Sequence, residues 1–329
     1  MVPVTDPDVS VIVPAFEAER YIAASLASIR DSRCAGIRFE VVVVDAGSND
    51  ATPEIVEAIG RSDHRFRLLR SDRRLTAPEA RNVALTTVRA PIVACLDHDD
   101  ETLPDRLTRH VGVLTAEPGI AAVGGALTAV DTIGVSLGDG PTTTTDLGIE
   151  TSRYVLPFHC PTLTSAMTYR VSALRAVGGF VEDRPYADDY HLFAALFDHG
   201  GVRILAEPAA RYRHHPGQLS IERRPEQQLE VTLLRQRLAA AVLGSPPPIG
   251  VVWAWKHPSN ADRPTRELAV EFLDRYHVGF LDRYSPAGDD LERIVDLHLR
   301  RREMILAAND SGRAAYSRPG EDPTMERAR

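Results

Sequence analysis

The sequence contains little cysteine, almost no lysine and no long apolar run. Its three cysteines, Cys34, Cys95 and Cys160, are far apart and odd in number, which excludes a disulfide framework and a cysteine-based zinc site. Lys256 is the single lysine, so arginine supplies nearly all positive charge, and its planar guanidinium suits a diphosphate. No segment approaches the ~18–20 apolar residues of a transmembrane helix, so we expect no transmembrane segment.

The chain also lacks a positive net charge. Its formal net charge of −8 gives no sequence-wide reason to bind nucleic acid or an anionic membrane. The N-terminal residues are polar and contain proline, unlike a signal peptide. We therefore expect a cytoplasmic protein that does not bind nucleic acid.

The 329 residues, of which 43% are hydrophobic, suffice for one large α/β domain with an appendage. Short apolar, β-branched runs alternate with segments of helical spacing, which predicts parallel βαβ units in a doubly wound sheet. The expected strands are 9–13, 41–44, 66–69, 92–96 and 120–123. In such a sheet, ligands bind beyond the carboxyl ends of the strands.

The pattern changes after about residue 124. Residues 128–157 are rich in Thr, Gly and Asp, and we expect a long surface excursion there. The later chain is mainly helical in pattern, over 226–242, 266–276 and 290–308. The last twenty residues are polar, which predicts disorder.

An acidic cluster, Asp97-His98-Asp99-Asp100, follows the predicted strand 92–96. Carboxylates this close repel one another unless cations or hydrogen bonds compensate them. A hard divalent cation shared with substrate phosphates would do so. A solvated acidic turn explains the cluster equally well when it is taken alone.

Two further strand ends carry polar residues, in Val13-Pro14-Ala15-Phe16-Glu17 and Asp45-Ala46-Gly47-Ser48. Gly47 would let the backbone approach a ligand closely, and Asp45 could accept hydrogen bonds from a base or ribose. Ordinary βα turns are the alternative, since Ser, Asn and Asp favour turns.

Three later segments carry candidate chemistry. Arg81 could neutralise a phosphate, and Asn82 could contact a nucleoside, although a solvated helical arginine is more common. Asp188-Asp189 could cap a helix or supply a base that faces a cleft. His214-His215 could include a metal or phosphate contact, or could be a surface pair without a ligand.

Taken in order, these segments resemble the family-2 glycosyltransferases of the GT-A fold. The family pattern has Val-Pro-x-Tyr/Phe-Asn, Val-Asp-x-Gly-Ser-x-Asp, Ala-Arg-Asn, Leu-Asp-x-Asp-Asp, Gly-Gly-Phe, Glu-Asp-Tyr-Asp-Leu and Tyr-Arg-x-His. The matching segments here lie within residues 8–220 and begin at Val13, Val44, Ala80, Leu96, Gly178, Asp188 and Tyr212.

The resemblance implies a GT-A domain over residues 1–222, with a Rossmann-like, mostly parallel sheet flanked by helices. A helical extension over 223–308 and a disordered tail over 309–329 would follow. It implies a non-processive, inverting enzyme, since Gln-x-x-Arg-Trp and transmembrane helices are missing. Its cofactor would be Mn²⁺ or Mg²⁺. Its donor would be a nucleoside-diphosphate sugar, with a UDP-sugar favoured.

The resemblance also implies roles for individual residues. Asp189 would be the general base, and Asp99 and His215 would hold the metal. The donor pocket would contain Pro14, Phe16, Glu17, Asp45, Arg81, Asp97 and His98.

The chain departs from the family pattern at a few positions. Ala46 stands where Asp or Asn is frequent, Glu17 where Asn is frequent, and Asp188 where Glu is usual. The nucleotide, the sugar and the acceptor therefore stay open, and the acceptor could be a glycan, a lipid-linked sugar or a small molecule. Whether the protein forms a homo-oligomer is also open.

Two alternatives to a glycosyltransferase fit the sequence less well. A sugar nucleotidyltransferase would need a Gly-rich, arginine-bearing loop after the first strand, where Pro14-Ala15-Phe16-Glu17-Ala18 stands. A degenerate, non-catalytic nucleotide-sugar-binding scaffold is disfavoured by the presence of both Asp99 and Asp189.

Overall fold

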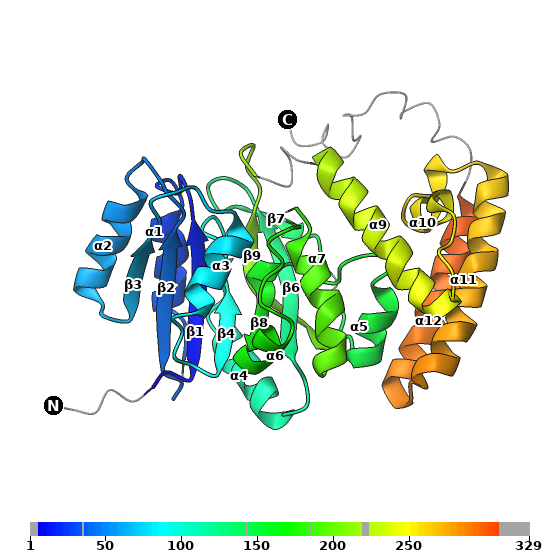
Figure 1. The fold of residues 1–329 in the computed structure, drawn as a ribbon, viewed down its shortest axis with the longest axis horizontal. Helices are drawn as coiled ribbons and strands as arrows, with labels where there is room; N and C mark the ends of the chain where they lie inside the picture. The colour runs from blue at the N-terminus through cyan, green and yellow to red at the C-terminus, as the bar shows by residue number, and fades with distance from the viewer. Residues whose placement is uncertain (1–5, 35, 143, 185, 219–223, 309–329) are drawn as a thin grey trace. The chain divides into compact units, whose positions relative to one another are not determined.

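The computed structural model describes residues 6–34, 36–142, 144–184, 186–218 and 224–308. The chain divides into two compact units (Figure 1). The first contains the chain up to Arg153 together with Cys160–Gln227, and the second contains Tyr154–His159 together with the chain from Gln228 onward. The segment Tyr154–His159 thus belongs to the second unit, although nothing in the sequence pattern indicates this.

One sheet forms the centre of the first unit. Its strand order is β3-β2-β1-β4-β8-β6-β9-β5, and β7 pairs with β6. The strands are β1 Val9–Ala15, β2 Phe39–Asp45, β3 Phe66–Arg70, β4 Ile92–Cys95, β5 Glu101–Thr102, β6 Ala122–Val130, β7 Ser136–Asp139, β8 Met167–Arg170 and β9 Val202–Arg213. The β3-β2-β1-β4 half is parallel, which confirms the predicted mostly parallel α/β sheet.

Sequence pattern accounts for the elements that hold this half together. Every residue of β1 and β2 is buried, as expected of parallel strands covered on both faces. The helices of the unit are α1 Ile22–Arg30, α2 Thr52–Ser62, α3 Ala77–Leu85, α4 Arg106–Ala116, α5 Ile149–Val155 (whose last two residues belong to the second unit), α6 Val171–Ala176 and α7 Asp188–Leu196. Helix α3 begins with a capping box between Thr76 and Glu79, with proline in its first turn, a strong helix start.

The second half of the sheet differs from the expectation. Strand β8 lies antiparallel between β4 and β6, and the predicted surface excursion 128–157 contains the end of β6, β7 and α5. Leu147 and Leu156 are buried, so the segment is not a simple surface excursion. The prediction agrees with the mostly exposed residues 131–142 and 144–146. It was wrong for 147–157, because threonine, glycine and aspartate dominate the stretch and obscure its short apolar groups.

The second unit is helical. Its helices are α9 Arg224–Leu243, which begins in the first unit, α10 Ile249–Lys256, α11 Arg263–Tyr284 and α12 Gly288–Ala307. The core consists of large aromatic side chains, and Phe158 packs edge-on against Trp255 and Tyr276. None of the helices in the described part of the chain combines the length and apolar character needed to span a bilayer.

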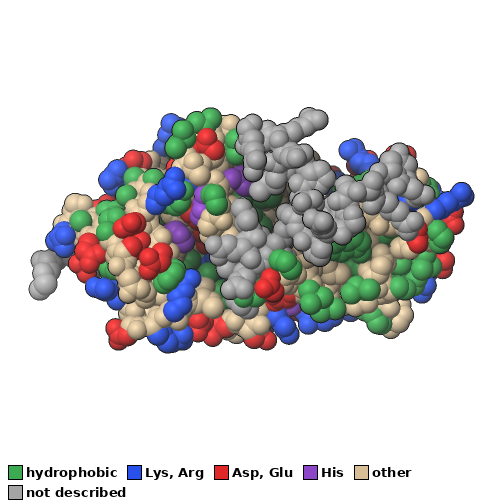
Figure 2. All heavy atoms as spheres, turned by 90° about the horizontal axis from the view of Figure 1, so that it is seen from above, with side chains coloured by type: hydrophobic (Ala, Val, Ile, Leu, Met, Phe, Trp, Pro, Cys, Tyr) green, Lys and Arg blue, Asp and Glu red, His purple; other side chains and the backbone are tan. Residues whose placement is uncertain are grey.

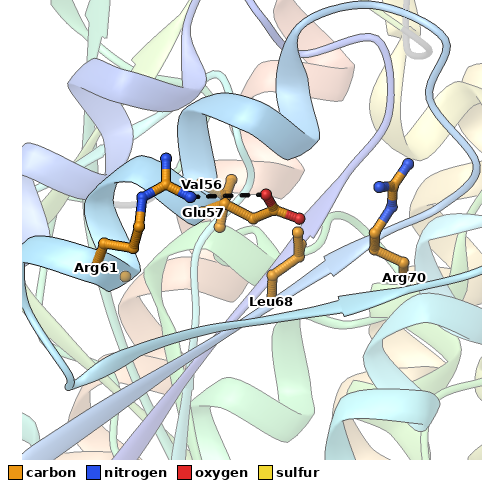
Figure 3. Close-up of a pocket in the computed structure, with 6 residues that line it drawn as sticks. Val56, Glu57, Arg61, Leu68 and Arg70 are labelled. Carbon is orange, nitrogen blue, oxygen red and sulfur yellow. Dashed lines mark ion pairs between the residues drawn. The ribbon is translucent and has the colours of Figure 1, made fainter.

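A shallow groove of about 370 Å³ lies between α2 and β3 (Figure 3). Its lining includes Val56, Leu68 and Arg70, together with Glu57 and Arg61, which are 3.9 Å apart. It contains no cluster of carboxylates, and we do not regard it as the functional site.

Candidate active site

The loops that follow β1 and β2 are bound to each other. The N–H of Glu17 donates to Ser48 Oγ at 3.0 Å, and the N–H of Asn49 donates to Glu17 Oε1 at 2.9 Å. Glu17 has a φ of +47°, a left-handed conformation that Asn adopts more easily than Glu. The backbone thus explains why Asn is frequent at this position in the family pattern.

The predicted nucleotide-pocket residues of these loops lie at the carboxyl edge of the sheet. Asp45 is buried, accepts a hydrogen bond from the N–H of Ser48 at 3.1 Å, and lies 4.0 Å from Arg70 Nε. The guanidinium of Arg74 lies over the ring of Phe16, 3.0 Å from its centroid. Arg70 and Arg74 thus contact two of the predicted pocket residues, and no spacing in the sequence indicates either contact.

The acidic cluster follows β4 at the same edge. His98 Nδ1 is 3.2 Å from the carbonyl oxygen of Pro14, so a predicted pocket residue at the end of β1 contacts one in the loop after β4. The N–H of Asp97 donates to Ser165 Oγ at 3.1 Å. Figure 2 shows the molecule of Figure 1 from above, and therefore shows the face at which β1 ends. Histidine side chains (purple) lie near one another on this face.

Asp99 and His215 are brought together although they are 116 residues apart, with His215 Nε2 2.9 Å from Asp99 Oδ2. The ring of Tyr21 lies beside His215, with the ring centroids 5.1 Å apart. His214 instead packs edge-on against Tyr212, at 5.1 Å between centroids. His215, rather than His214, therefore faces the acidic cluster.

The three carboxylates of the cluster have different environments. Asp100 is buried and accepts a hydrogen bond from the N–H of Arg213 at 2.9 Å. Burial, reinforced by Asp99 and Asp97, raises the pKa of Asp100 well above its usual range. Burial acts in the same direction at Asp99, but the hydrogen bond with His215 and the positive charges of His98 and His215 together outweigh it and lower the pKa of that carboxyl. These opposite shifts let the carboxyls lie close together.

Arg213 organises this loop, a role that the sequence did not reveal. Its side chain is buried; Nε donates to the carbonyl oxygen of Asp99 at 2.9 Å, and Nη2 lies 2.5 Å from Glu101 Oε1. Nη1 donates to the carbonyl oxygen of Asp131 at 3.1 Å. The arginine of Tyr-Arg-x-His thus fixes the backbone beside Asp99, and its motif was the available signal.

The donor set at Asp99 and His215 fits a divalent cation that is shared with a substrate. A carboxylate oxygen and an imidazole nitrogen both suit Mn²⁺, and Mg²⁺ prefers oxygen. Within the described ranges, no three His, Cys, Asp or Glu side chains form a group that could hold a metal ion. Such an ion would therefore need further ligands from phosphate oxygens or water, as Mg²⁺ usually has.

The guanidinium of Arg81 binds two carboxylates in this structure and is not free to bind a phosphate. Its side chain is 4% exposed; Nη2 lies 2.6 Å from Asp97 Oδ1, and Nη1 lies 2.8 Å from Asp188 Oδ2. Burial opposes its charge, but the two carboxylates outweigh burial and raise the pKa of Arg81 above its usual range. The predicted diphosphate contact would require Arg81 to leave one of these two carboxylates.

The side-chain amide of Asn82 is also fully engaged in hydrogen bonds within the protein. Its Nδ2 donates to the carbonyl oxygen of Phe180 at 2.8 Å and to Glu182 Oε1 at 2.7 Å, and the N–H of Phe180 donates to Asn82 Oδ1 at 2.8 Å. The suggested nucleoside contact is therefore wrong for this conformation, because both polar ends of the amide bind the Gly-Gly-Phe turn.

The first residues of α7 are the predicted general base Asp189 and its neighbour Asp188. Burial raises the pKa of Asp189, whose Oδ1 accepts a hydrogen bond from the N–H of Tyr190 at 2.7 Å. Burial also raises the pKa of Asp188, to about 7, against the effect of Arg81. Raised carboxyl pKa values in a cluster are typical of sites where protons are exchanged.

Residues 10–171 match the family model described as Glycosyl transferase family 2. The chain is 33% identical over 231 residues to the succinoglycan biosynthesis protein ExoO of Rhizobium meliloti, with 66% of this chain and 63% of ExoO covered. It is 29% identical over 225 residues to a Haemophilus influenzae glycosyltransferase, with 65% and 68% covered. The chain thus spans less than two thirds of the length of ExoO.

Solved structures share the fold. Staphylococcus aureus TarS 1-349 in complex with UDP-GlcNAc superposes with a TM-score of 0.60 at 19% identity, covering 94% of this chain and 91% of TarS. The mannosyltransferase PcManGT from Pyrobaculum calidifontis, in complex with GDP-Man and Mn²⁺, gives 0.55 at 21% identity, covering 92% and 84%. The predicted GT-A fold is thereby confirmed, and with the family match the chain belongs to glycosyltransferase family 2.

Proposed function

We propose that this chain transfers a single sugar from a nucleoside-diphosphate sugar to an acceptor hydroxyl, with inversion at the anomeric carbon. Family and fold support glycosyl transfer. The observation that carries the proposal is the approach of His215 to Asp99, to 2.9 Å across 116 residues, at the sheet edge where α/β folds bind ligands. A solvated acidic turn would not need a buried arginine and a distant histidine to hold it.

The donor pocket is proposed to consist of the loops after β1, β2 and β4. Asp45, Phe16 and Glu17 would face the nucleoside, and Pro14, Asp97 and His98 would lie toward the ribose and diphosphate. TarS was solved with UDP-GlcNAc and PcManGT with GDP-Man, which supports a nucleoside-diphosphate sugar as donor. We favour a UDP-sugar.

Asp99 and His215 would hold the divalent cation. A bound Mn²⁺ or Mg²⁺ supplies positive charge that stabilises the departing nucleoside diphosphate. PcManGT was solved with Mn²⁺, which supports manganese. This chain would supply two metal ligands, a carboxylate oxygen of Asp99 and an imidazole nitrogen of His215.

Asp189 would be the general base. Its carboxylate would take the proton of the acceptor hydroxyl while that oxygen forms a bond to the anomeric carbon. The bond between this carbon and the diphosphate oxygen breaks, and its electron pair leaves with the nucleoside diphosphate. A single displacement of this kind inverts the anomeric configuration and requires no covalent intermediate.

The acceptor is proposed to be a glycan or a lipid-linked sugar. Relatives of this chain are named for succinoglycan biosynthesis and for glucosyl transfer to an α-D-GlcNAc-diphosphoundecaprenol, which supports both classes. The cytoplasm is the compartment that we propose for the reaction.

A two-step experiment tests this function. Thermal unfolding is measured with UDP, GDP, TDP and CDP, each with Mn²⁺ and with EDTA, and hydrolysis of the matching nucleotide sugars follows. We expect one nucleotide to raise the unfolding temperature only with Mn²⁺, and its sugar to be hydrolysed. Stabilisation without turnover of any nucleotide sugar would favour a binding scaffold, and no stabilisation at all would contradict the proposal.

A further inference from the structure

Helix α3 contacts the segment that leads into α7 at two separate points. Arg81 binds Asp188, the first residue of α7, at 2.8 Å. Its neighbour Asn82 binds both backbone polar groups of Phe180, eight residues earlier in the chain. Two consecutive residues thus fix both the start of the segment and the start of the helix that carries Asp189.

The same guanidinium also reaches the acidic cluster. Nη2 of Arg81 lies 2.6 Å from Asp97 Oδ1, and the exposed fractions of the side chains are 4% for Arg81, 13% for Asp188 and 35% for Asp97. Charge-assisted hydrogen bonds of this length in a buried setting are strong and directional. Removing one partner would leave an uncompensated buried charge, so the three side chains act as a unit.

The turn held by Asn82 contains two glycines, and one of them lies directly against the Asn82 side chain. Gly178 and Gly179 have φ values of +87° and +93°, in the region that favours glycine. A Cβ atom on Gly179 would lie 2.5 Å from Asn82 Oδ1. The close approach lets Asn82 bind the turn, and this fixes the path of the backbone before α7.

We propose that Arg81 and Asp188 are positioning residues, and that their bridge to Asp97 holds the base Asp189 in register with the donor loop. This role replaces the phosphate contact suggested for Arg81, and it assigns a purpose to Asp188. The inference rests on the proposed function, because it takes Asp189 as the base. The bridge would transmit displacement of the donor loop to α7 through two ion pairs.

The test compares Asp188→Asn with wild type in transfer kinetics and in calorimetric binding of UDP with Mn²⁺, or of the nucleotide found to stabilise the protein. Because misplacing a reacting group by ~1 Å costs about 100-fold in rate, we expect kcat to fall about 100-fold. The donor KM and the nucleotide affinity should change by less than about threefold, the pattern of an interaction that matters in the transition state.

The pH profile provides a second readout. Among the described residues, the titratable and charged groups that interact with Asp189 are Asp188, Arg81, Asp97 and the buried Tyr169 on β8. Removing the Asp188 charge leaves Arg81 less compensated, which favours the carboxylate form of Asp189. We expect the acid limb of kcat to move to lower pH in Asp188→Asn, which a purely structural loss of packing would not produce.

Three further variants keep the test decisive. Asp188→Glu retains the charge and should keep kcat within about tenfold of wild type, in line with retained ion pairing. Asp183→Asn removes the same charge from an 80% exposed side chain nearby and should leave kinetics and pH profile unchanged. If Asp188→Asn fails to fold, it is replaced by Arg81→Lys, which keeps the charge but loses the planar fork that binds Asp97 and Asp188 together. The expectations for kcat, KM and nucleotide affinity are the same.

Different results overturn different claims. A wild-type protein that transfers no sugar contradicts the proposed function. An active wild type whose Asp188→Asn variant keeps its kcat and acid limb overturns the positioning role. Loss of nucleotide affinity in proportion to kcat also overturns it and would return Arg81 to the donor pocket.

Discussion

At the scale of single residues, Asp99 is the group on which metal binding depends in our account. Replacing it in Asp99→Ala removes the carboxylate that faces His215. We expect the variant to lose the Mn²⁺-dependent part of its affinity for the nucleotide, measured by calorimetry with Mn²⁺ and with EDTA. Asp105→Ala is a matched control, since Asp105 is exposed and makes no side-chain cap hydrogen bond.

An unchanged calorimetric affinity in Asp99→Ala with Mn²⁺ would rule out Asp99 as a metal ligand. The same loss in Asp105→Ala would show that the effect reflects net charge, not coordination. The two variants together separate a local ligand from the long-range field of an acidic protein.

Strand-end carboxylates could be predicted from the sequence, because parallel strands bring their carboxyl ends to one edge. Asp45 and Asp97 therefore lie where the pattern put them. The partner of Arg81 could not be predicted, since Asp188 is 107 residues away and only the folded chain decides which carboxylates meet a buried guanidinium. Side-chain pairing of this kind leaves no periodic signal.

At the scale of elements, the turn between α6 and α7 should be sensitive to added volume. Gly179→Ala places a Cβ 2.5 Å from Asn82 Oδ1 at a φ of +93°. Gly178→Ala has a similar φ of +87° but nothing within 4 Å of its Cβ. We expect Gly178→Ala to cost ~1–2 kcal/mol of unfolding free energy from backbone strain alone, and Gly179→Ala to cost more.

Urea unfolding of both variants measures this difference. A larger loss in Gly179→Ala isolates the contact with Asn82, since the strain is common to both. Equal losses would contradict the view that Asn82 holds this turn closely.

Strands β1, β2 and β4 of the parallel half could be predicted because each is a continuous buried run, and the partly buried β3 continues the same alternation of strand and helix. Strand β8 has only four residues, Met167–Arg170, and directly precedes α6. Its sequence is therefore too short for either the strand pattern or the helix pattern of apolar residues to be recognised. Strand β7 is exposed at all four positions and has no apolar face to reveal it. Short strands and exposed edge strands are specified by their neighbours in space.

At the scale of the whole molecule, acid should destabilise the helical unit through His277. Burial, together with His298, lowers the pKa of His277 to about 4, and the two rings stack at 4.0 Å. His277 therefore binds a proton below about pH 6.5 in the unfolded chain, but only below about pH 4 in the folded chain. The stability that neutral His277 contributes is fully present above about pH 6.5, and it is lost as the pH decreases from about 6.5 to about 4.

Thermal unfolding at pH 7 and pH 5 checks this prediction. We expect His277→Gln to show a smaller decrease in unfolding temperature between the two pH values than wild type. His64→Gln, at an exposed histidine, should behave as wild type. An undiminished decrease in His277→Gln would assign the acid sensitivity to other groups.

The organisation of the chain into units also exceeds what the sequence indicates. Tyr154 and Phe158 pack on Tyr276 in the helical unit, although more than one hundred residues separate them from it. Composition marks where helices replace strands, but it does not mark a six-residue segment whose aromatic side chains belong to another core. The division into a GT-A domain over 1–222 and a helical extension over 223–308 remains a proposal. The predicted disordered tail 309–329 lies outside the described residues.

The single-turnover transfer rate of Asp189→Asn at saturating donor tests the central claim most directly. As Asp189 is the proposed base, we expect the rate to fall by about 10²–10⁴-fold, with nucleotide affinity retained and Asp198→Asn, at an exposed residue beyond α7, unaffected. Because burial raises the pKa of Asp189, the wild-type rate should fall as the pH decreases through a value above that of an ordinary aspartate. A variant rate within tenfold of wild type would contradict Asp189 as the base.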